Sequence, residues 1–351
     1  METRGNHMSK GEYPVASFFR QNGRRAGYAL LSVVTVVLGG LCEVAPAAEI
    51  PVVRAGVLAF GTVNWELDVI AHHGLDHKHG FRLEVVKLAS ADAGTIALQG
   101  DATDTIVTNW LWVSKRRHDG ADYTFVPHSL TVGGLMVRPD AGINTIADLR
   151  GKRIGVAGGP SDKSWLLLRA YGIHAYGFDL NDAASPAFAA PPLLNQIMLR
   201  GEIPAALNFW HYHARLRAGG MRELITVSDM LSALGIKRAP PLIGWVFSEA
   251  WAAKSPAAVK GFLDSLRAAK EILAASDAEW TRLRPLTRAE DDATFAALRE
   301  GYRAGIPKSF GPEDVAAAEA TFEVLARVGG PKLVGAARAL TPGTFWAGYQ
   351  Y

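Results

Sequence analysis

The sequence is almost without cysteine. Among its 351 residues the only cysteine is Cys42, and this position lies in an N-terminal segment that we expect to be removed on export. The mature chain then has no thiol. This excludes a disulfide, a cysteine nucleophile and a metal site built on cysteine ligands.

An excess of charge of one sign is also missing. The chain contains 37 basic and 34 acidic residues, of which 32 and 31 follow residue 47, so the mature net charge is about +1. Nearly balanced charge provides no electrostatic footprint for nucleic acid or for an anionic membrane surface. We therefore expect neither nucleic acid nor the membrane itself as a partner.

Three motifs typical of enzymes do not occur: the Gly-x-Ser-x-Gly elbow, the His-Glu-x-x-His helix and the dinucleotide glycine fingerprint. The acidic run Glu290-Asp291-Asp292 could supply acid/base carboxylates. A solvated helix start is the simpler interpretation, because acidic residues are favoured in a first turn. We therefore predict no catalytic residue and no enzyme activity.

The N-terminus is typical of a secretory signal. Arginines precede an apolar run over 28–41, which at about 14 residues is too short to span a membrane comfortably. Ala45-Pro46-Ala47 then has the small-x-small form of a signal peptidase site. We predict a signal peptide over 1–47 and a periplasmic mature protein.

Two other export signals fit this segment less well. Lipidation of Cys42 requires a small residue before it, and Leu41 occupies that position. Arg24-Arg25 resembles the start of a twin-arginine signal, but Ala26-Gly27 do not complete the usual pattern. A lipid anchor is therefore disfavoured.

Strand and helix patterns alternate through most of the remaining chain. The first series covers 52–58, 64–73, 82–88, 95–98 and 104–107. A strand over 133–137 follows, and the unit over 146–156 then opens a second series that continues through 161–170, 192–200, 205–209 and 224–227. This alternation is typical of an α/β fold with mostly parallel sheets, which bind ligands at the carboxyl ends of their strands.

The length of the mature chain, about 300 residues, exceeds what one hydrophobic core normally holds. We therefore expect two lobes, the first made of 48–139 with 241–351 and the second of 140–240. An apolar strand over 241–248 returns to the first lobe, and the two crossings look like a hinge. A helical tail is predicted by three amphipathic segments, over 255–273, 291–303 and 312–326.

One turn is the most informative local feature. An apolar strand ending at Ala157 passes through Gly158 and Gly159 into the helix start Pro160-Ser161-Asp162. This suits an anion, because glycines admit a ligand close to the backbone and helix N–H groups point outward. The phosphate loop Gly-x-x-x-x-Gly-Lys-Ser/Thr is not matched, because Ala157 and Asp162 occupy its glycine positions. A capped helix without a ligand also fits.

A secreted two-lobed α/β chain whose second lobe begins with Leu149-Arg-Gly-Lys-Arg-Ile-Gly-Val-Ala157 and a glycine-rich turn resembles the solute-binding proteins of ABC importers. It is most similar to the group that binds nitrate, taurine, alkanesulfonates and thiamine-pyrimidine precursors. The resemblance covers 50–330 and implies the two-lobed type II periplasmic-binding-protein fold. It also implies a small-molecule ligand, a permease with its ATPase as partners, a monomer, and no cofactor.

The resemblance further implies a ligand cleft between the lobes, formed by loops and helix starts that follow strands. Carried onto this chain by position, the ligand-binding residues are Asn64, Trp65, Thr108, Asn109, Trp110, His128, Ser129, Gly158, Gly159, Pro160, Ser161, Asp162, Asn208 and Trp210.

The chemistry of these residues is that of a pocket for a small molecule. Indole rings offer flat walls, and amide and hydroxyl groups offer hydrogen bonds. For each tryptophan, packing in the core fits equally well. Lys163 could neutralise an anion at the turn or pair with Asp162, and no arginine follows a strand there. We therefore expect a neutral or singly charged solute, sulfonate-like or heteroaromatic.

Four histidines lie within eight positions, at His72, His73, His77 and His79, and two or three of them could meet around zinc or nickel. His72-His73-Gly74 is also typical of a helix C-terminus, where the dipole favours histidine and glycine stops the helix. Lys78 would add an unfavourable charge beside a metal. We therefore predict no metal site.

These observations predict a receptor that closes two lobes around a small organic solute and delivers it to a permease. Two alternatives stay open. One is a secreted enzyme or accessory protein on the same fold that acts on a heteroaromatic compound. The other is a ligand-free interaction or sensory module, whose cleft would be filled by side chains.

Overall fold

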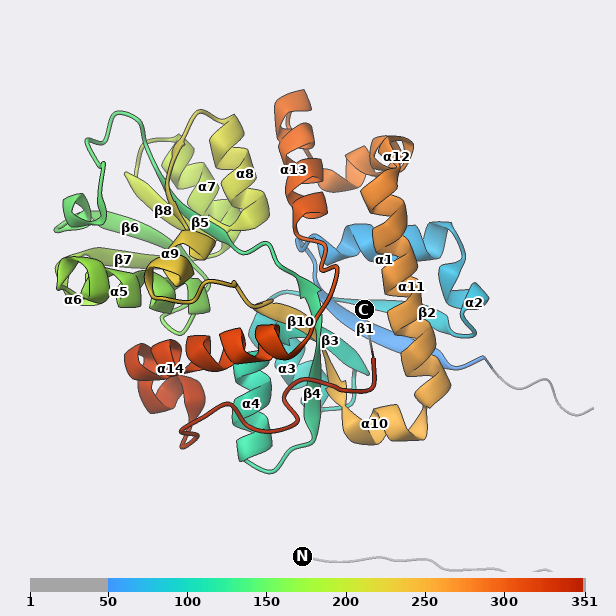
Figure 1. Ribbon diagram of the computed structural model, residues 1–351. Coiled ribbons are helices and arrows are strands. Elements are labelled where there is room, and N and C mark those ends of the chain that lie inside the picture. Colours follow the sequence, from blue (N-terminus) through green and yellow to red (C-terminus); the bar gives the residue numbers. More distant parts are fainter. Residues whose placement is uncertain (1–49, 350–351) are drawn as a thin grey trace, which may run out of the picture. The chain divides into compact units, whose positions relative to one another are not determined.

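Two β-sheets of five strands each organise residues 50–349, which are the residues that the computed structural model describes (Figure 1). The expected signal peptide over 1–47, with Cys42 and the cleavage site, lies outside these residues. No helix within 50–349 is long and apolar enough to cross a membrane.

The first sheet has the strand order β2-β1-β3-β10-β4. β1 pairs in parallel with β2 and β3, whereas β10 runs antiparallel to both of its neighbours. Its strands are β1 (Val52–Leu58), β2 (Arg82–Leu88), β3 (Thr105–Asn109), β4 (Tyr123–Ser129) and β10 (Ile243–Ser248). Because the antiparallel β10 lies between β3 and β4, the chain returns to this lobe after building the other.

The second sheet has the order β7-β6-β8-β5-β9. Its strands are β5 (Gly133–Val137), β6 (Arg153–Ala157), β7 (Ser185–Ala189), β8 (Ala205–Phe209) and β9 (Arg222–Thr226). β5 is antiparallel to β8 and β9. The expected boundary, which kept residues up to 139 with the first lobe, is therefore wrong for β5. Because β5 belongs to the second sheet, the chain passes from the first lobe to the second before Gly133.

Helices flank both sheets, as the alternating pattern predicted. The first lobe contains α1 (Val63–His72), α2 (Leu75–Lys78), α3 (Ala91–Gln99) and α4 (Trp110–His118). The second contains the 3₁₀ helix η1 (Ile146–Leu149), α5 (Lys163–Tyr176), α6 (Leu180–Ala183), α7 (Pro191–Leu199), α8 (Trp210–Ala218) and α9 (Val227–Ala233). The expected helical tail is confirmed by α10 (Glu249–Lys254), α11 (Pro256–Ala275), α12 (Asp277–Thr287), α13 (Asp292–Ala304) and α14 (Pro312–Val334).

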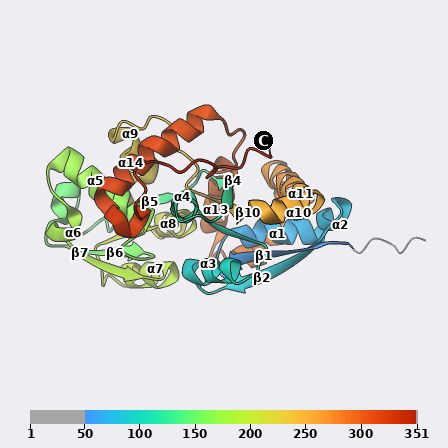
Figure 2. The same ribbon diagram turned by 90° about the horizontal axis from the view of Figure 1, so that it is seen from below.

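Two tail helices connect the lobes. α13 packs against α8, and α14 packs against α4 of the first lobe and α5 of the second. In both views α14 lies beside α5 (Figures 1 and 2). Phe322 and Leu325 of α14 share one hydrophobic core with Leu111 of α4 and Leu166 of α5. The apolar face predicted for the tail is therefore buried against both lobes.

The segment after α14 covers the outer edge of the first sheet. The backbone N–H of Phe125 in β4 donates to the carbonyl oxygen of Thr344 at 2.9 Å, and the N–H of Trp346 donates to that of Phe125 at 3.0 Å. The Trp346 ring packs 5.1 Å from Phe247 of β10. These contacts pair the edge strand β4 on both sides.

Candidate functional site

In each lobe, two parallel strands end where a helix begins. α1 follows β1 and α4 follows β3 in the first lobe, while α5 follows β6 and α8 follows β8 in the second. Across the lobes, the rings of Trp65 in α1 and Trp210 in α8 lie edge to face with centroids 6.1 Å apart. His211 lies against the backbone of Phe60. The strand ends of the two lobes therefore face each other, which is where α/β folds bind ligands.

The three tryptophans of the expected site are buried. Trp65 and Trp210 are 4% and 8% exposed. Trp65 also packs against Trp280 and Tyr302 of the C-terminal helices, with ring centroids 5.7 Å and 6.0 Å away. Trp110 is fully buried and packs against the C-terminal segment. Of the two interpretations that the sequence allowed, these positions correspond to core packing.

The side-chain amides of Asn64 and Asn208 form hydrogen bonds within the protein. Asn64 donates through Nδ2 to the carbonyl oxygens of Leu58 and Gly61, at 2.8 Å and 2.7 Å. Asn208 donates to Asn195 Oδ1 at 2.8 Å, and its own Oδ1 accepts a backbone N–H at 2.8 Å. The Asn64 bonds hold the loop between β1 and α1, and the Asn208 bonds join β8 to α7, so both amides position the site whether or not they touch a ligand.

Two further expected residues cap helices. Asn109 Oδ1 accepts a backbone N–H of the first turn of α4 at 3.0 Å. Asp162 Oδ1 accepts two backbone N–H groups of α5, at 2.9 Å and 3.3 Å, as the helix-start pattern predicted. Ser129 Oγ accepts a backbone N–H at 3.2 Å, and Thr108 is buried within β3.

The glycine turn before α5 is the accessible part of the expected site. Gly158, Pro160 and Ser161 are exposed and Gly159 is partly exposed. Gly158 has φ +87°, a conformation that strongly favours glycine. At Gly159 an added Cβ would meet no atom within 4 Å. A small molecule can therefore approach this backbone closely. In the loop after β1, the partly exposed Phe60 adds an aromatic ring that the sequence analysis did not select.

His128 lies in a buried polar cluster on the α11 side of the first sheet. Lys270 Nζ donates to Glu66 Oε2 at 2.5 Å and lies 3.2 Å from His128 Nδ1. The Tyr302 hydroxyl donates to the same Glu66 oxygen at 3.0 Å. All four side chains are buried. We name Glu66, His128, Lys270 and Tyr302 the Glu66 cluster.

Burial controls the ionisation of the Glu66 cluster. It raises the pKa of Glu66, against the opposing effect of Lys270, and lowers the pKa of Lys270, against the opposing effect of Glu66. Burial and the nearby ammonium group hold the pKa of His128 well below its usual value. The imidazole is therefore neutral at pH 7 and pairs with Lys270 through an unprotonated nitrogen.

The Glu66 cluster was not selected from the sequence except for His128. Lys270 lies on the buried face of α11 between Leu266 and Leu273. The sequence pattern that could have identified it is a lysine at helical spacing within an apolar helix face. A buried lysine requires a partner. Its partner Glu66 could not be identified, because the two lie 204 positions apart in the chain.

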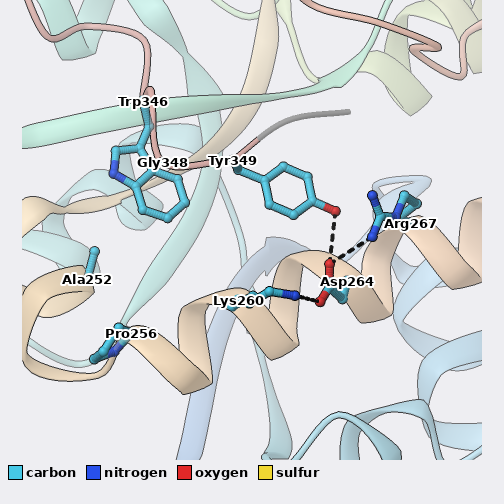
Figure 3. Close-up of a pocket in the computed structure, with 8 residues that line it drawn as sticks. All are labelled: Ala252, Pro256, Lys260, Asp264, Arg267, Trp346, Gly348 and Tyr349. Atoms are coloured by element: carbon cyan, nitrogen blue, oxygen red, sulfur yellow. Dashed lines mark hydrogen bonds and ion pairs between the residues drawn. The ribbon is translucent and has the colours of Figure 1, made fainter.

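Two of the cavities formed by residues 50–349 lie in the first lobe, and the lining of these two includes none of the expected ligand-binding residues. One, of about 410 Å³, is lined by Ala252, Pro256, Lys260, Asp264, Arg267, Trp346, Gly348 and Tyr349. Figure 3 shows its charged groups paired with one another: Asp264 accepts from Lys260 at 2.5 Å and from Arg267 at 3.0 Å. The other, of about 380 Å³, lies beside the Glu66 cluster and includes Lys270 and Trp245.

Several solved structures of solute-binding proteins share this architecture. The alkanesulfonate-binding protein SsuA from Xanthomonas axonopodis pv. citri, bound to MOPS, superposes with a TM-score of 0.67 and 17% identity, over 86% of this chain and 99% of its own. The periplasmic aliphatic sulphonate-binding protein SsuA from Escherichia coli gives 0.67 and 19%, over 86% and 93%. The periplasmic nitrate-binding protein NrtA from Synechocystis PCC 6803 gives 0.55 and 15%, over 72% and 69%.

These likenesses confirm the expected type II periplasmic-binding-protein fold. No curated protein sequence matches the chain. The family model described as NMT1/THI5 like does match, over residues 69–279. Because this match spans more than half of the sequence, the chain belongs to the NMT1/THI5-like family.

Proposed function

We propose that this protein is the extracytoplasmic substrate-binding component of an ABC importer and that it captures a small organic solute between its two lobes. Family membership and the binding proteins of the same fold support this role. The observation that carries it is the meeting of the strand ends of both lobes at Trp65 and Trp210. The proposal includes a periplasmic location, a monomeric state, and a permease with its ATPase as partners.

The proposed mechanism is hinge closure. A solute that contacts both lobes favours the closed arrangement by the difference between its contacts in the closed and open forms. In the second lobe we assign contact to the turn from Gly158 to Asp162, which is accessible. In the first lobe we assign it to the loop after β1 around Phe60 and Asn64.

The charge of the turn favours a sulfonate-like or heteroaromatic solute with at most one negative charge. The Asp162 carboxylate lies beside the backbone of Gly158, where an added Cβ would be 3.4 Å from Oδ2. It would repel a second negative charge on a ligand bound there. The partly buried Lys163 follows it and offers one compensating positive charge.

A thermal-shift screen tests the proposal directly. MOPS, taurine, linear alkanesulfonates, nitrate and hydroxymethylpyrimidine are compared with carboxylates of matched size. A solute at about 100 times its Kd stabilises the folded protein by about 2.7 kcal/mol, so at a fixed concentration the rise in Tm grows with the logarithm of the ligand's affinity. If none of these solutes raises Tm, the receptor proposal is contradicted.

A matched pair of variants locates the binding site. Gly159→Leu places a side chain in open space at the turn, so the fold tolerates it while a solute is excluded. Gly311→Leu, at the beginning of α14, also meets no atom within 4 Å and serves as the control. We expect Gly159→Leu to weaken calorimetric binding of the best solute at least ten-fold, which is about 1.4 kcal/mol. Equal affinities in the two variants would place the ligand elsewhere.

The contact between Trp65 and Trp210 favours one second candidate, a ligand-free interaction or sensory module. These buried rings fill part of the interface between the lobes with side chains. For such a module no solute in the screen raises Tm, and the protein binds a protein partner instead. Size-exclusion chromatography of the isolated protein separates a self-associating module from the monomer that the receptor proposal requires.

A further inference from the structure

Two histidines and a carboxylate meet at the far end of α1. His72 is the last residue of α1 and His73 is its C-cap, while Glu279 lies in the first turn of α12. Each offers one ligand atom, and these atoms all lie within 4.8 Å of one another. None of the three belongs to the proposed ligand site, and of the four clustered histidines only these two take part.

The carboxylate is fixed in place for a ligand role. Arg282 donates to Glu279 Oε1 at 2.9 Å and 2.6 Å, which leaves Oε2 directed at His73 Nε2 at 3.2 Å. Neighbouring ligand atoms of a tetrahedral zinc site, at about 2.0–2.1 Å from the metal, are about 3.3 Å apart. The observed separation thus already matches one edge of such a site, and the ligand atom of the exposed His72 lies within 4.8 Å of both.

The charges around these groups suit a cation. Glu279 pairs with Arg282, whose Nη2 lies 2.6 Å from Glu279 Oε1. Arg282 shares its charge with Asp68, 2.6 Å away, so the two carboxylates and one guanidinium leave one net negative charge. The C-terminal end of the α1 dipole adds to it.

We propose that His72, His73 and Glu279 form a zinc site. Two imidazoles and a carboxylate are a donor set that Zn²⁺ accepts, with a fourth position left for water or another ligand. The Arg282 guanidinium acts as the outer partner that orients the carboxylate. Binding joins the end of α1 to α12, far along the chain.

The test uses tag-free protein dialysed against a chelator and titrated calorimetrically with zinc chloride near neutral pH. We expect one zinc ion per chain. His72→Ala, His73→Ala and Glu279→Gln should each weaken binding by about ten-fold or more, the least that loss of an ordering partner costs in metal sites. Cobalt substitution supplies a second readout, because histidine ligation produces visible absorption bands that these variants lose.

His77→Ala and His79→Ala are the matched controls, since these histidines are close in sequence but outside the group of three. They should retain the parent affinity. His72 is exposed, so its variant keeps the fold, and the Tm measured without zinc verifies this for all variants. The proposal is overturned if no stoichiometric binding occurs, if binding survives His72→Ala and His73→Ala, or if the controls lose it equally.

Discussion

Acid should weaken the contact of α8 with the first lobe through His211. Burial, aided by Arg215, lowers the pKa of His211 from 6.5 to about 3. Because the folded value lies below the unfolded one, the unfolded chain binds more protons at acid pH. The loss of stability is absent well above pH 6.5 and grows as the pH falls toward the folded value. At about pH 5, about 1.5 units below the unfolded pKa, it amounts to about 2 kcal/mol.

Urea denaturation near pH 7.5 and near pH 5 measures this loss. The difference between the two pH values should be about 2 kcal/mol smaller in His211→Gln than in the parent, because glutamine cannot be protonated in this range. Part of the acid-induced loss of stability that remains in His211→Gln comes from His213, because burial lowers its pKa to about 4. His118→Gln, at an exposed position, controls for the substitution itself. If His211→Gln and the parent lose stability equally, His211 is not buried as described.

Two further predictions concern packing inside the first lobe. Lys270→Met leaves Glu66 buried without its cation and should lower the free energy of unfolding, measured by urea denaturation, by about 3–5 kcal/mol. Adding Glu66→Gln should recover part of this loss. A double variant as unstable as the single one would contradict the pairing. Gly261→Ala places a Cβ 2.3 Å from the carbonyl oxygen of His79 and should destabilise by about 1–3 kcal/mol. Gly94→Ala, also in a helix but with its nearest contact at 3.6 Å, should be neutral or stabilising; equal effects would refute the close approach.

The fold was predictable because its segments carry periodic patterns. The strand over 52–58 and the capped helix after Asp162 were confirmed, since continuous apolar runs and local capping chemistry depend on neighbours in the chain. The sheet to which Gly133–Val137 belongs was not predictable. A strand's own residues specify a buried strand and not its partners, which here come from β8 and β9.

The candidate site was predictable in location more than in detail. Asn64 lies in the first turn of α1 and Asn208 lies in β8, near the strand ends from which they were selected. Position near a strand end did not indicate where their amides point. Both amides bond to nearby backbone or side-chain oxygens. Burial of Trp65 depends on Trp280 and Tyr302, which lie more than 200 positions later in the chain. Such contacts arise only from tertiary packing.

The strand order of the first sheet has a consequence for the order of folding. β4 contacts the rest of its sheet through β10, which is synthesised more than 100 residues later. The outer edge of β4 is paired only when Thr344 to Trp346 are present. The second sheet, by contrast, uses only the contiguous residues 133–226. As the chain emerges, the lobe that is begun second can therefore complete its sheet first. The sheet of the lobe begun first is complete only after residues 344–346 have emerged.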